Sequence, residues 1–242
     1  MTFHIITLFP RAFRSYFGES ILKRAIEDKK IAVKFYNPRD YADNKWKRID
    51  SAPYGGGPGM VIQPLPVIKA VEAAVKSCKL KVKSKSKVKG QLSKVSLVWL
   101  SPNGKQFTNE AGTNYAKYTD IIIICGRYEG IDARVKKAVS IMRMPRIGMR
   151  IPRIALEEIS VGPFVLTGGE LPAMLMIDVI SRQVEGVLGD FNSREEARVA
   201  SPYVYTRPEV FTYNGRKLRV PKIILSGHRA KIDEWKLNRK SK

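Results

Sequence analysis

The stretch Asp120–Asp132 reads DIIIICGRYEGID, and its first six residues decide the fold class. Four consecutive isoleucines have a strong preference for β-structure, and an unbroken apolar run predicts a strand that is buried on both faces. Strands of this kind are typical of parallel sheets that helices cover on each side. The strand ends at Gly126, and a cation, an aromatic ring and two acids follow within the next six residues.

Patterns on either side of this stretch alternate between strand and helix. The other predicted strands are Phe3–Phe9, Ile31–Tyr36, Val95–Leu100 and Ile159–Leu166. Apolar residues at helical spacing predict helices over Ser15–Lys30, Leu65–Lys76 and Glu170–Arg182. This alternation predicts an α/β domain with a largely parallel sheet, which binds ligands beyond the carboxyl ends of its strands. We therefore expect a site in the loops after Leu100, Cys125 and Leu166.

The positive charge of the chain is concentrated in three segments. The 242 residues include 44 Lys and Arg against 22 Asp and Glu, a net charge of +22. Residues 76–94 carry +8, residues 136–153 carry +6 and residues 215–242 carry +8, so the remainder is neutral. This distribution predicts a balanced globular body with three basic attachments for a polyanion, most simply a nucleic acid.

Composition also excludes several classes of protein. Two cysteines, Cys78 and Cys125, and two histidines, His4 and His228, are too few for a disulfide scaffold, a four-cysteine zinc site or a histidine-rich metal site. Cys125 is expected to be a core residue rather than an activated thiolate. No apolar run approaches the roughly 20 residues that span a bilayer, and residues 1–13 do not resemble a signal peptide. We expect a cytoplasmic protein without a membrane partner.

The composition changes near residue 188. Residues 188–202 are polar, charged and rich in small side chains, so they are predicted to be a linker. The predicted organisation is a large domain over residues 1–187, this linker, and a small, mostly helical basic domain over residues 203–242.

Two further motifs are rich in glycine. Tyr54–Met60 reads YGGGPGM, with four glycines in five positions, and this favours a backbone that approaches a ligand closely; a tight surface turn is the alternative. Thr167–Pro172 reads TGGELP, a glycine turn before a helix, where backbone N–H groups could contact a carboxylate or an adenine edge. For Cys125–Asp132, the alternative to a functional site is an ordinary strand end followed by the capped start of a helix.

In this order, YGGGPGM, CGRYEGID and GGELPAM resemble the bacterial tRNA (guanine-N1)-methyltransferase family. The shared stretches run from end to end of the chain: Phe3–Pro10, Tyr54–Val61, Leu100–Gly104, Cys125–Asp132, Glu157–Arg182, Gly186–Gly189 and Tyr205–Glu209. The resemblance implies a homodimer with a SPOUT-type domain, in which the largely parallel sheet contains a deep trefoil knot. It also implies S-adenosylmethionine-dependent methylation of N1 of guanosine 37 in tRNA, with G36-G37 as the expected sequence.

The resemblance further implies the residues of the site. The cofactor pocket would include Leu100, Ser101, Pro102, Gly126, Tyr128, Glu129, Ser160, Val161, Gly162, Pro163, Phe164, Val165, Leu166, Gly168, Gly169 and Pro172. Asp50, Gly59 and Arg127 match positions that contact tRNA. Family activity is also associated with Mg²⁺, for which no ligands can be assigned from the sequence.

The catalytic groups that the resemblance implies are an arginine and a carboxylate. Arg182 would stabilise the charge on guanine O6, and a carboxylate of the linker would remove the proton from N1. A helix C-terminal cation is the alternative explanation for Arg182. The family's Asp-Ser-Phe triplet is absent from this linker, so Glu196 is the first candidate base, followed by Glu195 and Asp190.

Two other functions compete with this one. A basic RNA-binding protein without activity, or a related knotted methyltransferase acting on ribosomal RNA or a ribose 2′-OH, would also carry a large positive charge. The three glycine motifs at predicted strand ends argue against the first, and YGGGPGM with YTRPE at 205–209 argues against the second. Pro163, where the family usually has an acid, is a departure from the family pattern.

Overall fold

The computed structural model describes residues 1–79, 94–142, 156–189, 194 and 203–238 of the chain. Contacts between Cα atoms divide the protein into two compact units, Met1–Gly189 and Asp190–Lys242. The predicted boundaries at residues 187 and 203 stay predictions, because most of the predicted linker lies outside the described residues.

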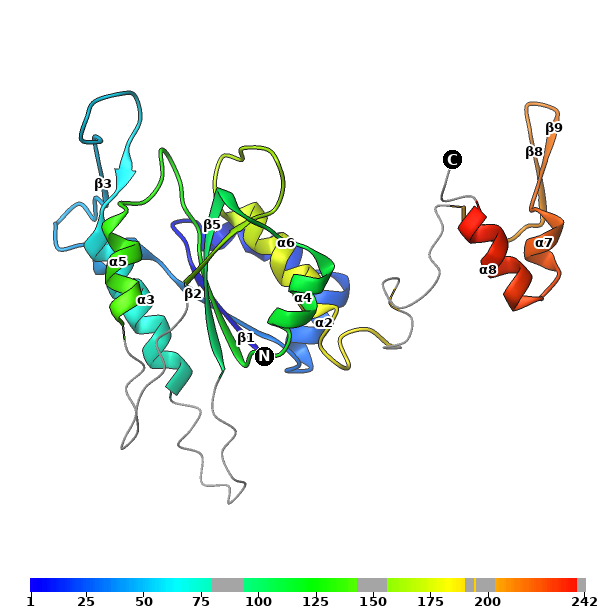
Figure 1. The fold of residues 1–242 in the computed structure, drawn as a ribbon, viewed down its shortest axis with the longest axis horizontal. Helices are drawn as coiled ribbons and strands as arrows, with labels where there is room; N and C mark the ends of the chain where they lie inside the picture. The colour runs from blue at the N-terminus through cyan, green and yellow to red at the C-terminus, as the bar shows by residue number, and fades with distance from the viewer. Residues whose placement is uncertain (80–93, 143–155, 190–193, 195–202, 239–242) are drawn as a thin grey trace, which may run out of the picture. The chain divides into compact units, whose positions relative to one another are not determined.

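The first unit alternates strands and helices (Figure 1). Its strands are β1 (Thr2–Ile6), β2 (Ala32–Tyr36), β3 (Asp50–Ser51), β4 (Val61–Ile62), β5 (Val95–Gln106), β6 (Asp120–Ile124) and β7 (Leu156–Ser160). Its helices are α1 (Arg14–Phe17), α2 (Ser20–Glu27), α3 (Pro64–Lys79), α4 (Asn109–Tyr115), α5 (Arg134–Ile141) and α6 (Glu170–Ser181), with 3-10 turns η1 (Pro10–Phe13) and η2 (Pro38–Tyr41).

Five of these strands form one sheet in the order β2-β1-β6-β5-β7, and every neighbouring pair is parallel. Helices α3 and α5 cover one face of the sheet, and α2, α4 and α6 cover the other (Figure 1). The predicted α/β class with a largely parallel sheet is therefore confirmed. The short strands β3 and β4 form a separate antiparallel pair.

The isoleucines of β6 supply both halves of the core. Ile121 and Ile123 pack in the cluster that includes α6, whereas Ile122 and Ile124 pack in the cluster beneath α3. All four are at most 1% exposed, as the unbroken apolar run predicts. Alternate side chains of a strand point to opposite faces, so an all-isoleucine strand fills both layers at once.

Strand β5 is longer than its predicted range, because it does not end at Leu100 but continues to Gln106. Leu100 and Lys105 both pair with Ile159 of β7, so residues 101–104 bulge out of a strand that continues to Gln106. A bulge of this kind uses the same turn-forming residues as a strand end, and only the pairing with β7 distinguishes the two.

Strand β7 is shorter than predicted, because the strand predicted for residues 159–166 ends at Ser160. The Ser160 hydroxyl accepts a hydrogen bond from the Gly162 amide (3.3 Å) and donates one to the Gly162 carbonyl (3.0 Å). Pro163 has no N–H with which to continue a ladder. Residues 161–169 therefore leave the sheet as a loop.

The predicted helix over Ser15–Lys30 is divided into α1 and α2. Gly18 ends α1, and Glu19 is extended, with φ −128° and ψ 152°. The apolar spacing across the break is nearly that of a continuous helix, which explains why the sequence pattern did not indicate it.

The second unit contains a hairpin and two helices. The hairpin pairs β8 (Val210–Tyr213) with β9 (Arg216–Arg219), and α7 (Lys222–Leu225) and α8 (Arg229–Asn238) follow. The prediction of a mostly helical unit did not include this hairpin. In neither unit does a described helix have the length and apolar character needed to cross a membrane.

Candidate functional site

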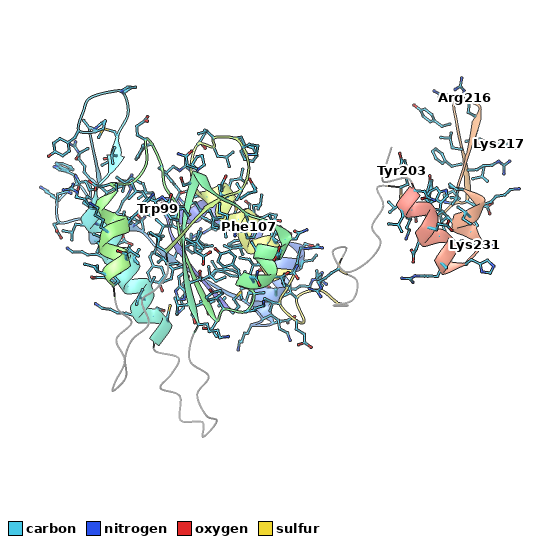
Figure 2. The ribbon with its side chains drawn as sticks, in the orientation of Figure 1. Trp99, Phe107, Tyr203, Arg216, Lys217 and Lys231 are labelled. Atoms are coloured by element: carbon cyan, nitrogen blue, oxygen red, sulfur yellow. The ribbon has the colours of Figure 1, made fainter. Side chains whose placement is uncertain are left out.

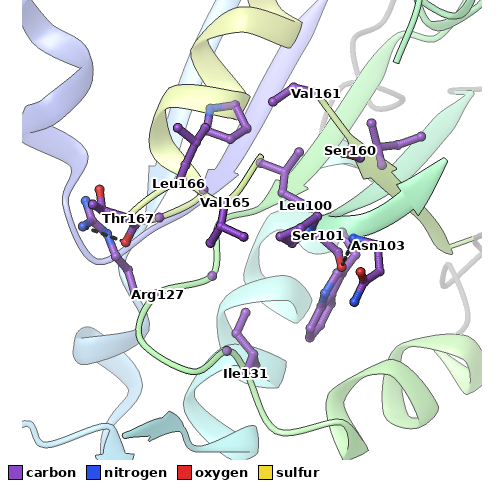
Figure 3. A pocket seen from close by; sticks show the side chains of 18 of the residues that line it. Leu100, Ser101, Asn103, Arg127, Ile131, Ser160, Val161, Val165, Leu166 and Thr167 are labelled. Carbon is purple, nitrogen blue, oxygen red and sulfur yellow. Dashed lines mark hydrogen bonds between the residues drawn. The ribbon is translucent and has the colours of Figure 1, made fainter. Parts of the chain in front are cut away.

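Three strand exits of the first unit surround one cavity of about 480 Å³ (Figure 3). The cavity lies at the carboxyl end of the sheet, where parallel α/β folds bind their ligands. Its lining comes from the bulge of β5, the segment after β6, the loop after β7 and the starts of α5 and α6. The residues are Trp99–Asn103, Gly126–Ile131, Ala133, Lys136, Ile159–Gly162, Phe164–Gly169 and Pro172.

Fifteen of the sixteen residues named as a cofactor pocket line this cavity, and Pro163 does not. Reasoning from strand ends and reasoning from the resemblance therefore lead to one place in the structure. Figure 3 shows Leu100 and Ile131 extending toward the cavity from different loops, with Ser101 and Asn103 at its side. The Asn103 amide donates a hydrogen bond to the Ser101 hydroxyl at 3.3 Å, which helps to shape the bulge.

The segment after β6 and the loop after β7 touch through backbone atoms. The Gly169 amide donates a hydrogen bond to the Gly126 carbonyl at 2.9 Å, and Arg127 and Gly168 form an isolated antiparallel bridge. A Cβ atom at position 169 would lie 2.6 Å from the Cα of Cys125, which is closer than real contacts allow. Only glycine permits this approach, so Gly169 fixes the start of α6 against the end of β6.

A buried carboxylate joins three segments beside the cavity. Glu170, 3% exposed, accepts a hydrogen bond from the Thr7 hydroxyl at 2.7 Å and one from Arg127 Nε at 2.9 Å. Arg127 also donates through Nη1 to the Thr167 carbonyl at 3.2 Å, and its guanidinium lies 4.6 Å from the centre of the Phe9 ring. The exits of β1, β6 and β7 are thereby held together.

The charges on the cavity wall are mostly paired. Lys136 Nζ lies 2.5 Å from a Glu158 carboxylate oxygen and 5.1 Å from the centre of the Trp99 ring. Arg127 is paired with Glu170. Glu129 has no ion-pair partner among the described residues. Within the described part of the chain, the Glu129 carboxylate is therefore a negative charge on the cavity wall without an ion pair, which favours a cationic ligand.

The YGGGPGM loop lies beside the CGRYEGID segment. It connects β3 to β4, and the Glu129 amide donates to the Met60 carbonyl at 3.1 Å. Its four glycines all have φ between +79° and +107°, so their conformations exclude most other residues. Of the residues predicted to contact tRNA, Asp50 lies in β3, Gly59 lies next to Glu129, and Arg127 is turned into the ion pair described above.

A family model described as tRNA (Guanine-1)-methyltransferase TrmD matches residues 1–242. The chain belongs to the TrmD family. A Clostridioides difficile protein named tRNA (guanine-N(1)-)-methyltransferase is 40% identical over 240 residues, covering 98% of this chain and 90% of the relative. A Dechloromonas aromatica protein of the same name is 42% identical over 240 residues, covering 97% and 84%. The sequence-based recognition is confirmed, and the chain is an enzyme of the methyltransferase class.

Arg182 is the one predicted catalytic group of this TrmD-family chain among the described residues, and it is not part of the cavity lining. Arg182 follows the last turn of α6, whereas the cavity lies at the first turn of the same helix. About 20 Å of helix separates Gly169 from Arg182, at 1.5 Å per residue. Glu196, Glu195 and Asp190 lie outside the described residues.

One group of metal-ligating side chains occurs among the described residues of the TrmD-family fold. His4, Cys78 and Asp120 are fully buried, with ligand atoms within 4.8 Å of one another. His4 Nε2 lies 3.0 Å from Asp120 Oδ1, and His4 Nδ1 lies 3.0 Å from the Tyr36 hydroxyl. These are hydrogen-bond distances, so the group forms a hydrogen-bonded network in the core. A thiol and an imidazole are also unsuited to the Mg²⁺ that the resemblance implies.

Sequence reasoning missed part of the cavity wall. The additional lining residues are Trp99, Asn103, Gly130, Ile131, Ala133, Lys136, Ile159 and Thr167. Arg127, which the resemblance assigns to tRNA contact, also lines the cavity. Most of them lie within the stretches shared with the TrmD family, and Trp99 and Ala133 lie directly beside these stretches, so the shared stretches were the available signal. Lys136 is different, because it reaches the cavity from the first turn of α5.

Cys125 lies at the end of β6, directly beneath the glycine contact. It is 3% exposed, and burial, with a further effect of Glu170, raises the pKa of its thiol well above the usual value. A raised pKa leaves less thiolate at any given pH, so the thiol is a poor nucleophile.

We therefore predict that Cys125 does not react in the native TrmD-family protein. A Cys78→Ser chain, which retains Cys125 as its single thiol, should react with Ellman's reagent at pH 8 only after addition of urea. A full equivalent of fast-reacting thiol in the native variant would show that Cys125 is accessible and activated.

Proposed function

We propose that this enzyme transfers a methyl group from S-adenosylmethionine to N1 of guanosine 37 in tRNA, in the cytoplasm where tRNA is decoded. The observation that carries the proposal is the convergence of three strand exits, two of which carry the family motifs CGRYEGID and GGELPAM, on one cavity. The curated relatives are named for methylation of guanine N1 in tRNA. The donor and position 37 come from the resemblance described in the sequence analysis.

The cavity fits the proposed donor. Its volume of about 480 Å³ is within the range of roughly 300–1,000 Å³ that is usual for small-molecule sites. Apolar side chains such as Leu100 and Ile131 can flank a purine, and the backbone near Gly168 can approach it closely. When bound, S-adenosylmethionine supplies a methyl group on a positively charged sulfur, and the Glu129 carboxylate matches that charge.

The chain's own groups would prepare the guanine. N1 of guanine carries a proton at neutral pH and lies on the Watson–Crick edge, so the base must be turned out of its stack. A carboxylate takes the N1 proton, which leaves an electron pair on N1 and negative charge on O6. The Arg182 guanidinium stabilises that charge on O6. In this proposal Glu196 is the base, and Glu195 and Asp190 are the second and third candidates; this ranking comes from the sequence alone.

A second copy of the chain would complete the site. The cavity and Arg182 lie at opposite ends of α6, so an arginine that acts at the cavity has to come from another protomer. Helix α6 is apolar on most of its surface, which is typical of a helix that is covered on all sides. Leu171 and Leu175 are nevertheless exposed, in line with Asp178 and Arg182 at helical spacing. We propose that this stripe is covered in a homodimer.

The crossing of loops at the cavity supports the proposed trefoil knot. Strand β7 lies at the sheet edge beyond β5, yet the loop after it returns to contact the exit of β6 at Gly126. The continuation of β5 pairs again with β7, since Gln106 pairs with Ser160. Segments that pass each other in this way are the ingredients of a knot, which the parallel sheet order alone would not suggest.

The second unit has the composition of an RNA-binding domain. Arg216 and Lys217 extend from the β8–β9 hairpin (Figure 2), and all residues of β9 are exposed. Exposed aromatic side chains such as Tyr213 accompany these cations. We propose that this surface binds tRNA phosphates, which would make the affinity fall steeply with salt.

Methylation should depend on the base at position 37. With S-adenosylmethionine labelled in its methyl group, a tRNA transcript with G36-G37 should acquire one methyl group at N1 of G37. The matched transcript with A37 should acquire none. Methylation of a ribose, or of another base with equal efficiency in both transcripts, would contradict the proposal.

Removal of the proposed base should abolish turnover without affecting the donor. We expect Glu196→Gln to lower single-turnover methyl transfer by about 10²-fold or more, the scale of general-base catalysis, with unchanged affinity for S-adenosylmethionine. Glu195→Gln is the matched control and should retain most of the activity. Normal turnover of Glu196→Gln would exclude Glu196 as the base.

A charge on the exposed stripe of α6 should dissociate the dimer. In sedimentation analysis the wild-type chain should have twice the monomer mass, and Leu171→Glu should have the monomer mass, because burial of an unpaired carboxylate opposes association. Leu171 is 57% exposed, so the monomer should remain folded. Leu225→Glu, in the second unit, is the control; a monomeric wild-type chain would refute the homodimer.

A further inference from the structure

The resemblance implies that Arg127 contacts tRNA, but the structure gives this side chain another set of partners. Its Nε donates to Glu170, its Nη1 donates to the Thr167 carbonyl, and its guanidinium lies against the Phe9 ring. The side chain is only 26% exposed. Three directions of the guanidinium are therefore occupied by groups of the same protomer, and Figure 3 shows it directed toward Thr167 at the edge of the cavity.

Glu170 is the partner that makes this arrangement specific. Its side chain is 4% exposed, and both carboxylate oxygens accept hydrogen bonds, one from Thr7 and one from Arg127. Glu170 is also the first residue of α6, where the helix dipole stabilises a negative charge. The Thr7 hydroxyl in turn accepts a hydrogen bond from the Phe9 amide at 3.0 Å.

The segments joined by this pair are the walls of the cavity. Arg127 belongs to the segment after β6, and Thr167 and Glu170 bracket the end of the loop after β7. Two backbone contacts join these walls, the Gly169–Gly126 hydrogen bond and the Arg127–Gly168 bridge. The ion pair therefore adds a side-chain contact between the two walls beside these backbone contacts.

We propose that Arg127 and Glu170 are a positioning pair, which holds the two walls of the donor pocket at the separation that S-adenosylmethionine requires. Neither residue is assigned a chemical step, and Arg127 is not a phosphate contact. The inference rests on the proposed function, because it concerns the donor that the cavity binds. It extends that function to Glu170, which lies within GGELPAM but is not among the residues that the resemblance assigns to the pocket.

Donor affinity and tRNA affinity distinguish this role from a phosphate contact. We expect Glu170→Gln and Arg127→Lys each to weaken S-adenosylmethionine binding to the full-length protein roughly tenfold or more, measured by calorimetry. The double variant should be no weaker than the weaker single variant, because both changes break one unit. The slope of log tRNA affinity against log salt should stay at its wild-type value in both single variants.

Arg127→Lys is the decisive variant, because it keeps the positive charge but cannot donate to Glu170 and Thr167 with the geometry of a guanidinium. It also keeps the proposal testable if Glu170→Gln does not fold. Arg134→Gln is the matched control: Arg134 is an exposed arginine nearby in the chain, paired with Asp132, and its removal should leave donor affinity unchanged.

Two results would overturn the positioning pair. One is a wild-type donor affinity in Arg127→Lys and in every folded Glu170 variant. The other is an Arg127→Gln variant that binds the donor normally but whose slope of log tRNA affinity against log salt is smaller in magnitude by about 0.9. That change is expected when one phosphate contact is lost. If the wild-type chain binds no S-adenosylmethionine, both the proposed function and the positioning role of Arg127 and Glu170 are refuted. If the wild-type chain binds the donor and the variants bind it equally well, only the positioning role is refuted.

Discussion

The cavity depends on one close approach, the contact between Gly169 and the end of β6. The Gly169 amide donates to the Gly126 carbonyl, and no side chain larger than hydrogen fits above Cys125. This contact sets where α6 begins, and it brings the loop after β7 past β5 to the middle of the sheet. The ion pair of Arg127 with Glu170, the cavity between the loops and the direction of α6 all follow from it.

The layers of the fold could be predicted from the sequence because hydrophobic periodicity reports burial directly. The isoleucines of β6 are the best example, since their unbroken run requires apolar neighbours on both faces of the sheet. The bulge of β5 could not be predicted in the same way. Residues 101–104 have ordinary turn chemistry, and their place within a strand depends on pairing of Leu100 and Lys105 with Ile159, a long-range contact that has no local signal.

The residues of the candidate site also separate into those that the sequence could locate and those that it could not. Residues within the glycine motifs could be located from the sequence, and fifteen of the sixteen named residues line the cavity. Lys136 could not, because it lies outside these motifs and reaches the wall from the first turn of α5. The direction of Arg127 was also beyond the sequence. Its ion pair with the buried carboxylate of Glu170 is a long-range contact that has no local signal.

The central claim is that the three loops form the binding site of the methyl donor, and hydrogen exchange of the full-length protein tests it most directly. Addition of S-adenosylmethionine should slow amide exchange in residues 100–103, 126–131 and 160–169, the segments that contain most of the cavity lining. Amides in β8 and β9, which belong to the second unit, should exchange at an unchanged rate. Protection confined to other segments, or no protection at saturating donor, would contradict the account.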